Sequence, residues 1–337
     1  MTAPFHNVAI FAKPRTEGNR PALQHVLLQI VRLVEQASLT PLIEAGTRDA
    51  VDLRGFDGHP LSVLVQKADL AIVLGGDGTM LGIARELSAH AIPLIGINFG
   101  RLGFITDIGL DDVPDVLSDM LAGRFEADRR TLLEAEVLRD GESLHRGRAF
   151  NDVVVSHGTA GGILGFTVRV DGATMYTQRA DGVILATPTG STAYALSASG
   201  PILHPSLAGL VLVPVAPHTL SNRPIALPDS VVVEIELSDL RDASAHFDMQ
   251  LFSPLRPGDV VRARLSPDRV TLLHPAGYNY FETLRRKLHW NVLSGEPYGR
   301  ASTRARRACS RCCSPCPSAT SSSSNRLNWI SGRVSPC

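Results

Sequence analysis

Residues 70–79 read LAIVLGGDGT and decide the fold. Leu70–Leu74 is apolar at every position, which is typical of a strand buried on both faces of a parallel sheet. The residues from Thr79 to Ala89 have helical spacing, so the glycine-rich turn joins a strand to a helix. The turn therefore lies at the C-terminal end of a parallel strand, where α/β proteins bind their ligands.

The flanking sequence repeats this alternation of strand and helix. Apolar runs predict strands over 8–11, 39–43 and 92–97, and helical spacing predicts helices over 21–37 and 113–121. In the first of these helices, Leu23, Leu27 and Ile30 fall on one face. Such alternation predicts an α/β layer built on a parallel sheet.

The pattern changes after about residue 128, where short β-rich runs separated by glycine- and proline-bearing turns predict a β-sandwich-like region. A helix over 279–290 closes this region. The predicted architecture is α/β plus all-β. It consists of an α/β phosphate-binding domain (1–127), a β-rich domain (128–295) and a tail (300–337).

The composition is that of a globular protein. The chain has 337 residues, about two domains' worth, with 44% hydrophobic residues and 33 bases against 33 acids. This excludes a mostly disordered chain and argues against a dedicated nucleic-acid binder. No apolar run approaches the ~20 residues of a membrane span, and the N-terminus lacks the pattern of a signal peptide. We therefore expect a cytoplasmic protein that binds neither membrane nor nucleic acid.

The tail differs from the body in amino-acid composition. From residue 300 onward it holds seven arginines, ten serines, no acid and all five cysteines of the chain. We expect it to be disordered, since it has little apolar surface to bury, and a shifted reading frame would also produce such a segment. Its two CxxC pairs abut and no histidine accompanies them, which argues against a zinc site. The body, being free of cysteine, gives no hint of secretion.

Asp77 is the informative residue of the glycine-rich turn. Glycines at the start of a helix let a phosphate approach the backbone. A carboxylate beside such a phosphate site is unfavourable unless it takes part in the reaction. Asp77 could hold Mg²⁺ or accept a proton from an attacking hydroxyl group. The alternative is a tight turn in which Asp77 merely caps the helix. The turn is neither a P-loop nor a GxGxxG fingerprint.

Three further segments carry polar groups suited to a nucleoside. Asn151 and Asp152 precede a predicted strand, and residues 179–182 (RADG) precede another. Residues 187–194 read TPTGSTAY, which combines turn formers, small hydroxyl groups and one aromatic ring with a polar tip. Such a surface suits a flat base and the edge of a sugar.

Together with GGDGT, these segments resemble bacterial NAD kinases, especially the Gram-negative form, over roughly residues 5–295. The stretches TQRADG, TPTGSTAYALSASGPI, PHTLSNRPI and YFETLRRKLHW match in order and spacing. The resemblance implies transfer of the terminal phosphoryl group of ATP to the 2′-hydroxyl of the adenosine ribose of NAD, with Mg²⁺, in a homodimer or homotetramer. GGDGT alone is shared with lipid kinases of the diacylglycerol type, so a lipid kinase and a non-enzymatic NAD sensor are the alternatives.

The resemblance also implies roles for single residues. Asp77 would be the base, and Gly78 would face phosphate. The remaining residues expected to bind substrate are Phe104, Asn151, Asp152, Arg179, Asp181, Thr192, Ala193, Tyr194, Ser197 and Gln250. For the two aromatic residues the alternative is core packing, and for Arg179 it is a solvated surface charge.

Two positions depart from the family pattern, and the metal ligands are unknown. Phe99 stands where the family has an arginine, and Met249 stands where it has a glycine. The first removes a phosphate contact unless Arg101 substitutes, and the second crowds a turn that needs glycine. His218, His246 and His274 lack metal-ligand spacing, so we expect each to be a structural residue.

Overall fold

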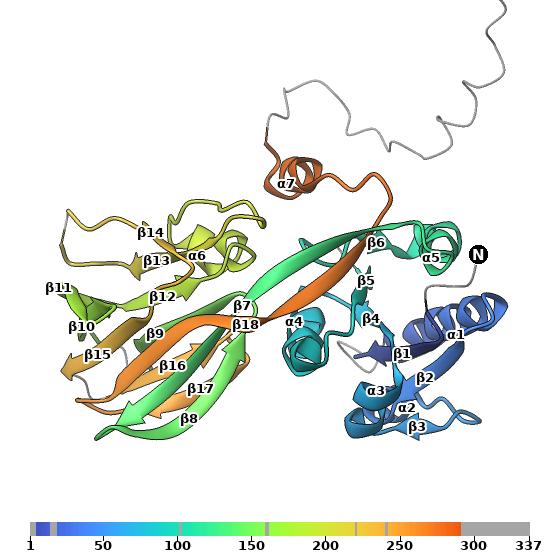
Figure 1. Cartoon of the computed structure of the whole chain (residues 1–337), viewed down its shortest axis with the longest axis horizontal. Helices are drawn as coiled ribbons and strands as arrows, with labels where there is room; N and C mark the ends of the chain where they lie inside the picture. The colour runs from blue at the N-terminus through green and yellow to red at the C-terminus, as the bar shows by residue number, and fades with distance from the viewer. Residues whose placement is uncertain are drawn as a thin grey trace, which may run out of the picture. The chain divides into compact units, whose positions relative to one another are not determined.

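The structure is a computed structural model that describes residues 5–13, 19–100, 103–158, 162–219, 221–239 and 242–290 (Figure 1). The tail predicted to be disordered, including its cysteines, lies outside these residues. Within the part described, the predicted combination of an α/β layer with antiparallel β-structure is confirmed.

The α/β layer is built on five parallel strands in the order β3-β2-β1-β4-β5. Their bounds are Asn7–Ala12 (β1), Thr40–Glu44 (β2), Gly58–His59 (β3), Leu70–Gly75 (β4) and Leu94–Asn98 (β5). Every residue of β4 is buried, as the apolar run predicts. Alternate side chains of β1 enter different clusters: Val8 and Ile10 lie on one face of the sheet, and Ala9 and Phe11 on the other.

Helices cover both faces of this layer. Buried residues of α1 (Arg20–Gln36), α2 (Ala45–Val51) and α5 (Val113–Leu121) share one cluster, and those of α3 (Leu61–Lys67) and α4 (Asp77–Leu87) share another. The α1, α4 and α5 helices were predicted, whereas α2 and α3 were not. Each has only seven residues, too few for a clear helical period.

Two long antiparallel strands carry the sheet from the α/β layer into the β-rich region (Figure 1). They are β7 (Phe125–Arg139) and β18 (Val260–Pro275). Near its end β18 pairs in parallel with β5, and near its start it pairs with β15. The result is one twelve-stranded sheet, which also contains β6 (Ile108–Gly109), β8 (Glu142–Ala149), β10 (Leu164–Val170), β11 (Ala173–Ala180) and β15 (Val233–Asp239).

A second, six-stranded antiparallel sheet packs on the β-rich end of the first. Its order is β14-β13-β12-β9-β16-β17. The bounds are Asp152–His157 (β9), Gly182–Ala186 (β12), Gly209–Val215 (β13), Ile225–Pro228 (β14), Ala243–Phe247 (β16) and Leu251–Leu255 (β17). One cluster joins the sheets through side chains such as Phe166 and Val183. Ala195 and Leu203 pack on the other face of the second sheet.

Two further helices belong to the β-rich region. The short α6 (Tyr194–Ser197) follows the TPTGSTAY run, and α7 (Tyr280–Leu288) matches the predicted closing helix. The Asn279 side chain caps α7 by accepting hydrogen bonds from the backbone N–H groups of Phe281 and Glu282. Among the helices described, none has the length and apolar character that crossing a bilayer requires.

Candidate active site

Asp77 occupies the first turn of α4, but it does not cap the helix. The capping position belongs to Gly76 and has no side-chain hydrogen bond. The Asp77 carboxylate instead faces the segment that follows β5. Its Oδ2 accepts a hydrogen bond from the Phe104 N–H at 2.8 Å, and its Oδ1 accepts from the Thr106 hydroxyl at 2.9 Å and from the Ile105 N–H at 3.4 Å. The capping interpretation of Asp77 is therefore wrong.

We call residues 103–106 the cradle of Asp77. Thr106 is fully buried, and its hydroxyl also accepts a hydrogen bond from the Asn98 side chain at 2.8 Å. Gly103 leaves the space that the carboxylate fills, because a Cβ built there lies 1.8 Å from Asp77 Oδ1. With two donors on Oδ1 and one on Oδ2, the carboxylate is fixed in orientation and keeps a lone pair on Oδ2 for a substrate proton.

Gln250 connects the start of α4 to the turn between β16 and β17. Its Nε2 donates to the carbonyl oxygen of Gly78 at 2.7 Å, and its Oε1 accepts from Arg85 Nη2 at 2.7 Å. Arg85 Nη1 also donates to Asp248 Oδ2 at 2.5 Å, and the Asp248 side chain is fully buried. Two expected substrate-binding residues, Gly78 and Gln250, thus lie together.

Asp248 in turn holds the backbone around the predicted ribose-binding pair. Its carboxylate accepts hydrogen bonds from the N–H groups of Phe150, Asn151 and Asp152, at 2.9, 2.7 and 3.2 Å. Asp152 is 2% exposed and its Oδ1 has no partner among the described residues. Burial, and then the charge of Asp248, raise the pKa of Asp152 to about 7. The chain therefore presents a carboxyl group that changes charge near neutral pH.

The TPTGSTAY run lies directly against Asn151. The Thr187 N–H donates to the Asn151 carbonyl oxygen at 2.9 Å, and the Thr187 hydroxyl donates to the carbonyl oxygen of Phe150 at 2.7 Å. A Cβ on Gly190 lies 2.0 Å from the Asn151 carbonyl oxygen, so glycine is required at this contact. These contacts hold the run against the backbone of residues 150 and 151, which the sequence alone does not reveal.

The other expected binding residues lie in the same region with different exposures. Thr192, Ala193 and Tyr194 are half-buried, and Ser197 is exposed. Tyr194 packs against the apolar cluster that contains Ala195 and Leu203 on the outer face of the six-stranded sheet.

Arg179 and Asp181 flank the end of β11. Arg179 is exposed and forms a 3.2 Å ion pair with Asp239, which agrees with the surface-charge alternative. Asp181 is half-buried, and its backbone N–H donates to the Val215 carbonyl oxygen at 3.0 Å. Phe104 is half-buried and meets Asp77 through its backbone rather than its ring. These observations leave the substrate contacts of all three residues as predictions.

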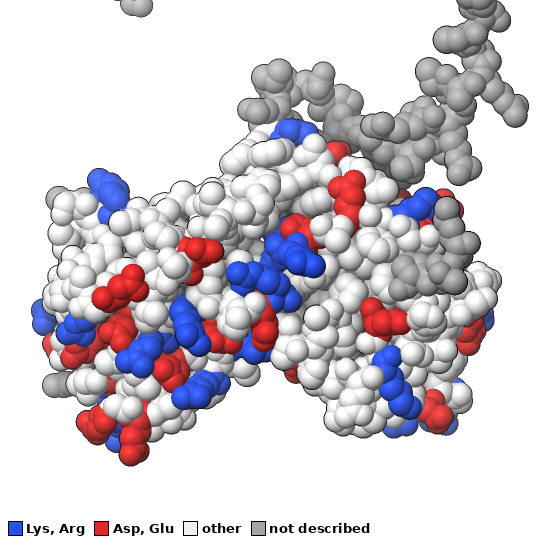
Figure 2. All heavy atoms as spheres, viewed as in Figure 1, with Lys and Arg blue, Asp and Glu red and all other residues white. Residues whose placement is uncertain are grey.

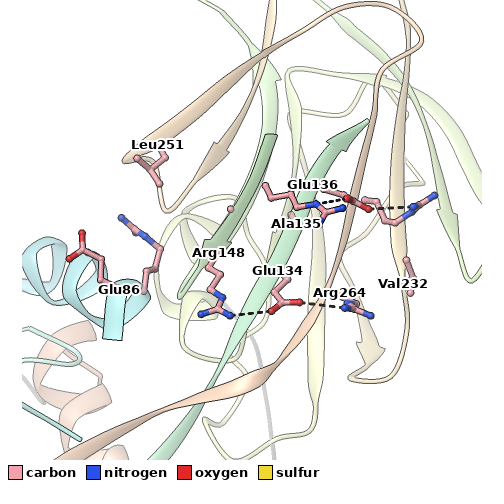
Figure 3. Close-up of a pocket in the computed structure, with 13 residues that line it drawn as sticks. Glu86, Glu134, Ala135, Glu136, Arg148, Val232, Leu251 and Arg264 are labelled. Carbon is pink, nitrogen blue, oxygen red and sulfur yellow. Dashed lines mark hydrogen bonds and ion pairs between the residues drawn. The ribbon is translucent and has the colours of Figure 1, made fainter. Parts of the chain in front are cut away.

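A charged cavity of about 810 Å³ lies next to this site, between α4 and the outer face of the twelve-stranded sheet (Figure 3). Two glutamates at its centre each form ion pairs with two arginines. Glu134 pairs with Arg148 and Arg264. Glu136 pairs with Arg146 and Arg262. Asp268 and Glu234 neutralise Arg148 and Arg262 further. Figure 2 likewise shows acidic and basic side chains mixed over the molecule's face. Every arginine that lines the cavity is thus paired with a carboxylate.

Comparison with known proteins identifies the family. Residues 61–125 match the N-terminal domain of ATP-NAD kinase, and residues 150–274 match its C-terminal domain. The NAD kinase of Cupriavidus pinatubonensis is 51% identical over 291 residues, which cover 86% of this chain and 94% of the relative. The Burkholderia pseudomallei NAD kinase is 49% identical over 85% of this chain and 94% of the relative.

The chain belongs to the NAD kinase family.

Solved structures of NAD kinase relatives share the fold. Yeast NADH kinase, crystallised with NADH, superposes with a TM-score of 0.78 at 23% identity, covering 89% of this chain and 91% of its own. An Archaeoglobus fulgidus NAD kinase, crystallised with ATP, gives a TM-score of 0.64 at 22% identity, covering 84% and 98%. Identities this low establish the architecture alone.

Sequence reasoning missed the residues that hold this NAD kinase site together. Gly103 and Asp248 lie within segments that match the family pattern, but the sequence does not show which residues they contact. Thr106 and Arg85 had no signal at all, because each acts across a large separation in the chain. Among the described residues there is also no cluster of three or more metal-ligating side chains.

Proposed function

We propose that the chain phosphorylates the 2′-hydroxyl group of the adenosine ribose of NAD with the terminal phosphoryl group of ATP, giving NADP and ADP. One observation carries this proposal within the family: Asp77 is oriented at the strand-to-helix turn by donors on both oxygens. A lipid kinase and a non-enzymatic NAD sensor find no support in the family matches, which cover both ends of the site.

Asp77 Oδ2 is the proposed proton acceptor. As the 2′-oxygen attacks the terminal phosphorus of ATP, its proton passes to Asp77, while the bond to the bridging oxygen breaks and ADP leaves. Enzymes of this kind act mainly by positioning and by stabilising negative charge on the transferred group. The N-terminal turn of α4, with exposed Gly78, provides a partial positive charge beside the phosphate.

The proposed dinucleotide site extends from Asn151 and Asp152 across the loop 187–191 to α6. Asn151 and Asp152 would hold ribose hydroxyl groups, and Tyr194 and Ser197 would line the pocket of base and nicotinamide together with Asp181, Thr192 and Ala193. Phe104 would stack on a ring, Gln250 would contact the ligand, and Arg179 would leave Asp239 to approach a phosphate. A homodimer or homotetramer, a cytoplasmic location and a division into domains at residues 127 and 128 complete the proposal.

The residues of this site fit an Mg²⁺ ion that binds together with the phosphates of ATP, rather than an ion held by protein ligands alone. Asp77 offers a carboxylate at the turn, and the described residues form no cluster of three or more metal-ligating side chains. Mg²⁺ is commonly bound by one or two carboxylates plus substrate phosphates. When bound, the ion would neutralise charge on the donor's phosphates. Asp77 would remain the residue that orients and accepts the proton.

The test is NADP formation by the purified full-length chain from NAD, ATP and Mg²⁺, with Asp77→Asn in parallel. The amide keeps the shape of the carboxylate but cannot accept the proton, so we expect turnover to fall by about 10²–10⁴-fold with NAD binding intact. Wild-type activity in Asp77→Asn would remove Asp77 as the base. NAD binding without any turnover in the wild-type protein would favour the sensor, and phosphorylation of diacylglycerol would favour the lipid kinase.

A further inference from the structure

Four charged side chains form a line across the junction between the α/β layer and the β-rich region. His274 on β18 lies between two acids: its Nδ1 is 2.8 Å from Asp107 Oδ2, and its Nε2 is 3.7 Å from Asp128 Oδ2. Asp128 Oδ2 then accepts a hydrogen bond from Arg130 Nε at 2.7 Å. The signs alternate along the line when His274 is protonated. We call Asp107, His274, Asp128 and Arg130 the junction line.

The junction line is mostly buried, with only the Asp128 side chain as much as 26% exposed, so its charges compensate one another. The His274 side chain is 1% exposed and Arg130 is 2% exposed. Burial lowers the pKa of His274, but the hydrogen bond with Asp107 and the interaction with Asp128 outweigh burial and raise it above the ordinary value. The ring of Tyr278 stacks on the imidazole, with centroids 3.8 Å apart. This packing leaves His274 one orientation, with one nitrogen directed at each acid.

One end of the junction line meets the cradle of Asp77. Asp107 directly follows Thr106, whose hydroxyl donates to Asp77. The segment is pressed against β5, since a Cβ on Gly96 lies 2.8 Å from the Ile105 carbonyl oxygen. Ile108, which follows Asp107, pairs with Ile97 of β5, so the His274–Asp107 pair adds a side-chain anchor between the cradle and β6.

The other end meets the loop that lies against Asn151. Arg130 Nη1 donates to the Thr189 hydroxyl at 3.3 Å. Thr189 belongs to the loop 187–191, in which the Gly190 N–H donates to the Thr187 hydroxyl at 3.0 Å. A displacement of Arg130 is therefore transmitted through Thr189 to the proposed dinucleotide site.

We propose that His274 and Arg130 are positioning residues for the two halves of the reaction: His274 holds the cradle of Asp77 through Asp107, and Arg130 holds the dinucleotide loop through Thr189. The kinetic part of this inference rests on the proposed function. Neither residue touches substrate; each acts through the group it holds. The two ends then predict different kinetic defects, which a general loss of stability would not produce.

The test compares two amides at position 274. In His274→Asn the amide nitrogen takes the place of Nδ1 and keeps the donor to Asp107, whereas in His274→Gln it takes the place of Nε2 and keeps only the donor toward Asp128. We expect His274→Asn to keep kcat within about threefold. We expect His274→Gln to lose about tenfold to 100-fold in kcat with an unchanged KM for NAD, since a misplacement near 1 Å costs about 10²-fold.

Arg130→Met tests the other end of the junction line. It should raise the KM for NAD by about tenfold and leave kcat within about threefold. Arg139→Met is the matched control, because Arg139 also lies on β7 and forms a two-pronged ion pair with buried Asp259 at 2.8 Å, away from the site. We expect it to lower thermal stability with both constants unchanged.

Hydrogen exchange tests the positioning role of His274 without requiring the proposed kinase activity. The N–H groups of Phe104 and Ile105 should exchange at least about tenfold faster in His274→Gln than in His274→Asn, whether or not the protein is active. Equal exchange in the two variants, or losses of kcat that merely follow the folded fraction, would overturn the positioning role. A wild-type protein without NADP formation, but with the expected exchange, would overturn only the proposed function.

Discussion

Gly103→Ala displaces the proposed base without altering it chemically. The added Cβ lies 1.8 Å from Asp77 Oδ1, 2.3 Å from Thr106 Oγ1 and 2.5 Å from Asp77 Cγ. Ordinary van der Waals contact begins near 3.4 Å, so the carboxylate and the cradle must separate by about 3.4 − 1.8 = 1.6 Å. The hydrogen bonds that orient Asp77 cannot survive such a movement.

The expected result is a loss of turnover with the dinucleotide site preserved. A misplacement of about 1 Å costs roughly 10²-fold in rate, so kcat should fall by about 100-fold or more. Asn151 and the loop 187–191 are held by other contacts, so the KM for NAD should stay within about threefold. Asp77 is half-exposed and can be solvated when displaced, so the melting temperature should fall by only a few degrees.

The assay is NADP formation under saturating NAD and ATP, with the melting temperature measured on the same preparation. Gly109→Ala is the matched control, since Gly109 has an ordinary φ of −78° and its Cβ meets nothing closer than 3.4 Å. We expect wild-type kinetics from this control. A Gly103→Ala enzyme with kcat within threefold of wild type would refute the argument that the cradle sets the rate through Asp77.

Three further predictions concern the buried carboxylates and their turn. Arg85→Met leaves Asp248 buried without its cation, which should destabilise the fold by about 3 kcal/mol or more and lower the melting temperature by roughly 6 °C or more. Burial and the Asp248 charge raise the pKa of Asp152 to about 7, so the folded chain holds an extra proton between about pH 4 and 7 and loses stability as pH rises through this window. In ligand-free thermal melts, Asp152→Asn should therefore gain melting temperature relative to wild type from pH 5 to pH 8. Met249→Gly should stabilise the chain by about 0.5–1 kcal/mol in thermal melts, because Met249 has a left-handed φ of 54°.

Each of these has its own control. Arg54→Met removes an ion pair in which both side chains are mostly exposed, and should leave the melting temperature unchanged. An Arg85→Met protein as stable as this control would contradict the burial argument. A constant difference in melting temperature between Asp152→Asn and wild type at all pH values would exclude Asp152 as the titrating group. Met249→Ala keeps the strain of the turn, so stabilisation by alanine as well as glycine would point to a cause other than φ.

The elements that sequence reasoning predicted well are those whose pattern is local. The buried run Leu70–Leu74 and the spacing of α1 each carry their own signal over a single element. GGDGT likewise predicted a turn between a strand and a helix, which the structure has between β4 and α4. The same motif singled out Asp77, which lies in the first turn of α4.

The contacts that hold the site could not be predicted because they join residues far apart in the chain. The fully buried Thr106 looks like any threonine of a loop, and Arg130 looks like one of two consecutive arginines in a strand. Nothing local indicates that Asp248, nearly 100 residues away, organises the backbone of 150–152. Even the capping interpretation of Asp77 failed for this reason, since its partners follow the next strand along the chain.

The two departures from the family pattern, Phe99 and Met249, differ in how far their side chains are buried. Phe99 is half-buried and packs on the cluster under α1 and α5, so its side chain extends the core of the α/β layer. Met249 gains nothing comparable: its side chain is 55% exposed, and it follows Asp248, itself at φ 52°, in a turn closed by the Gln250 N–H on the Phe247 carbonyl oxygen at 3.0 Å. This is the geometry in which Asp-Gly is favoured. The backbone strain at Met249 is carried by the turn that positions Asp248 and Gln250, because their hydrogen bonds to 150–152, Arg85 and Gly78 hold the turn in that conformation.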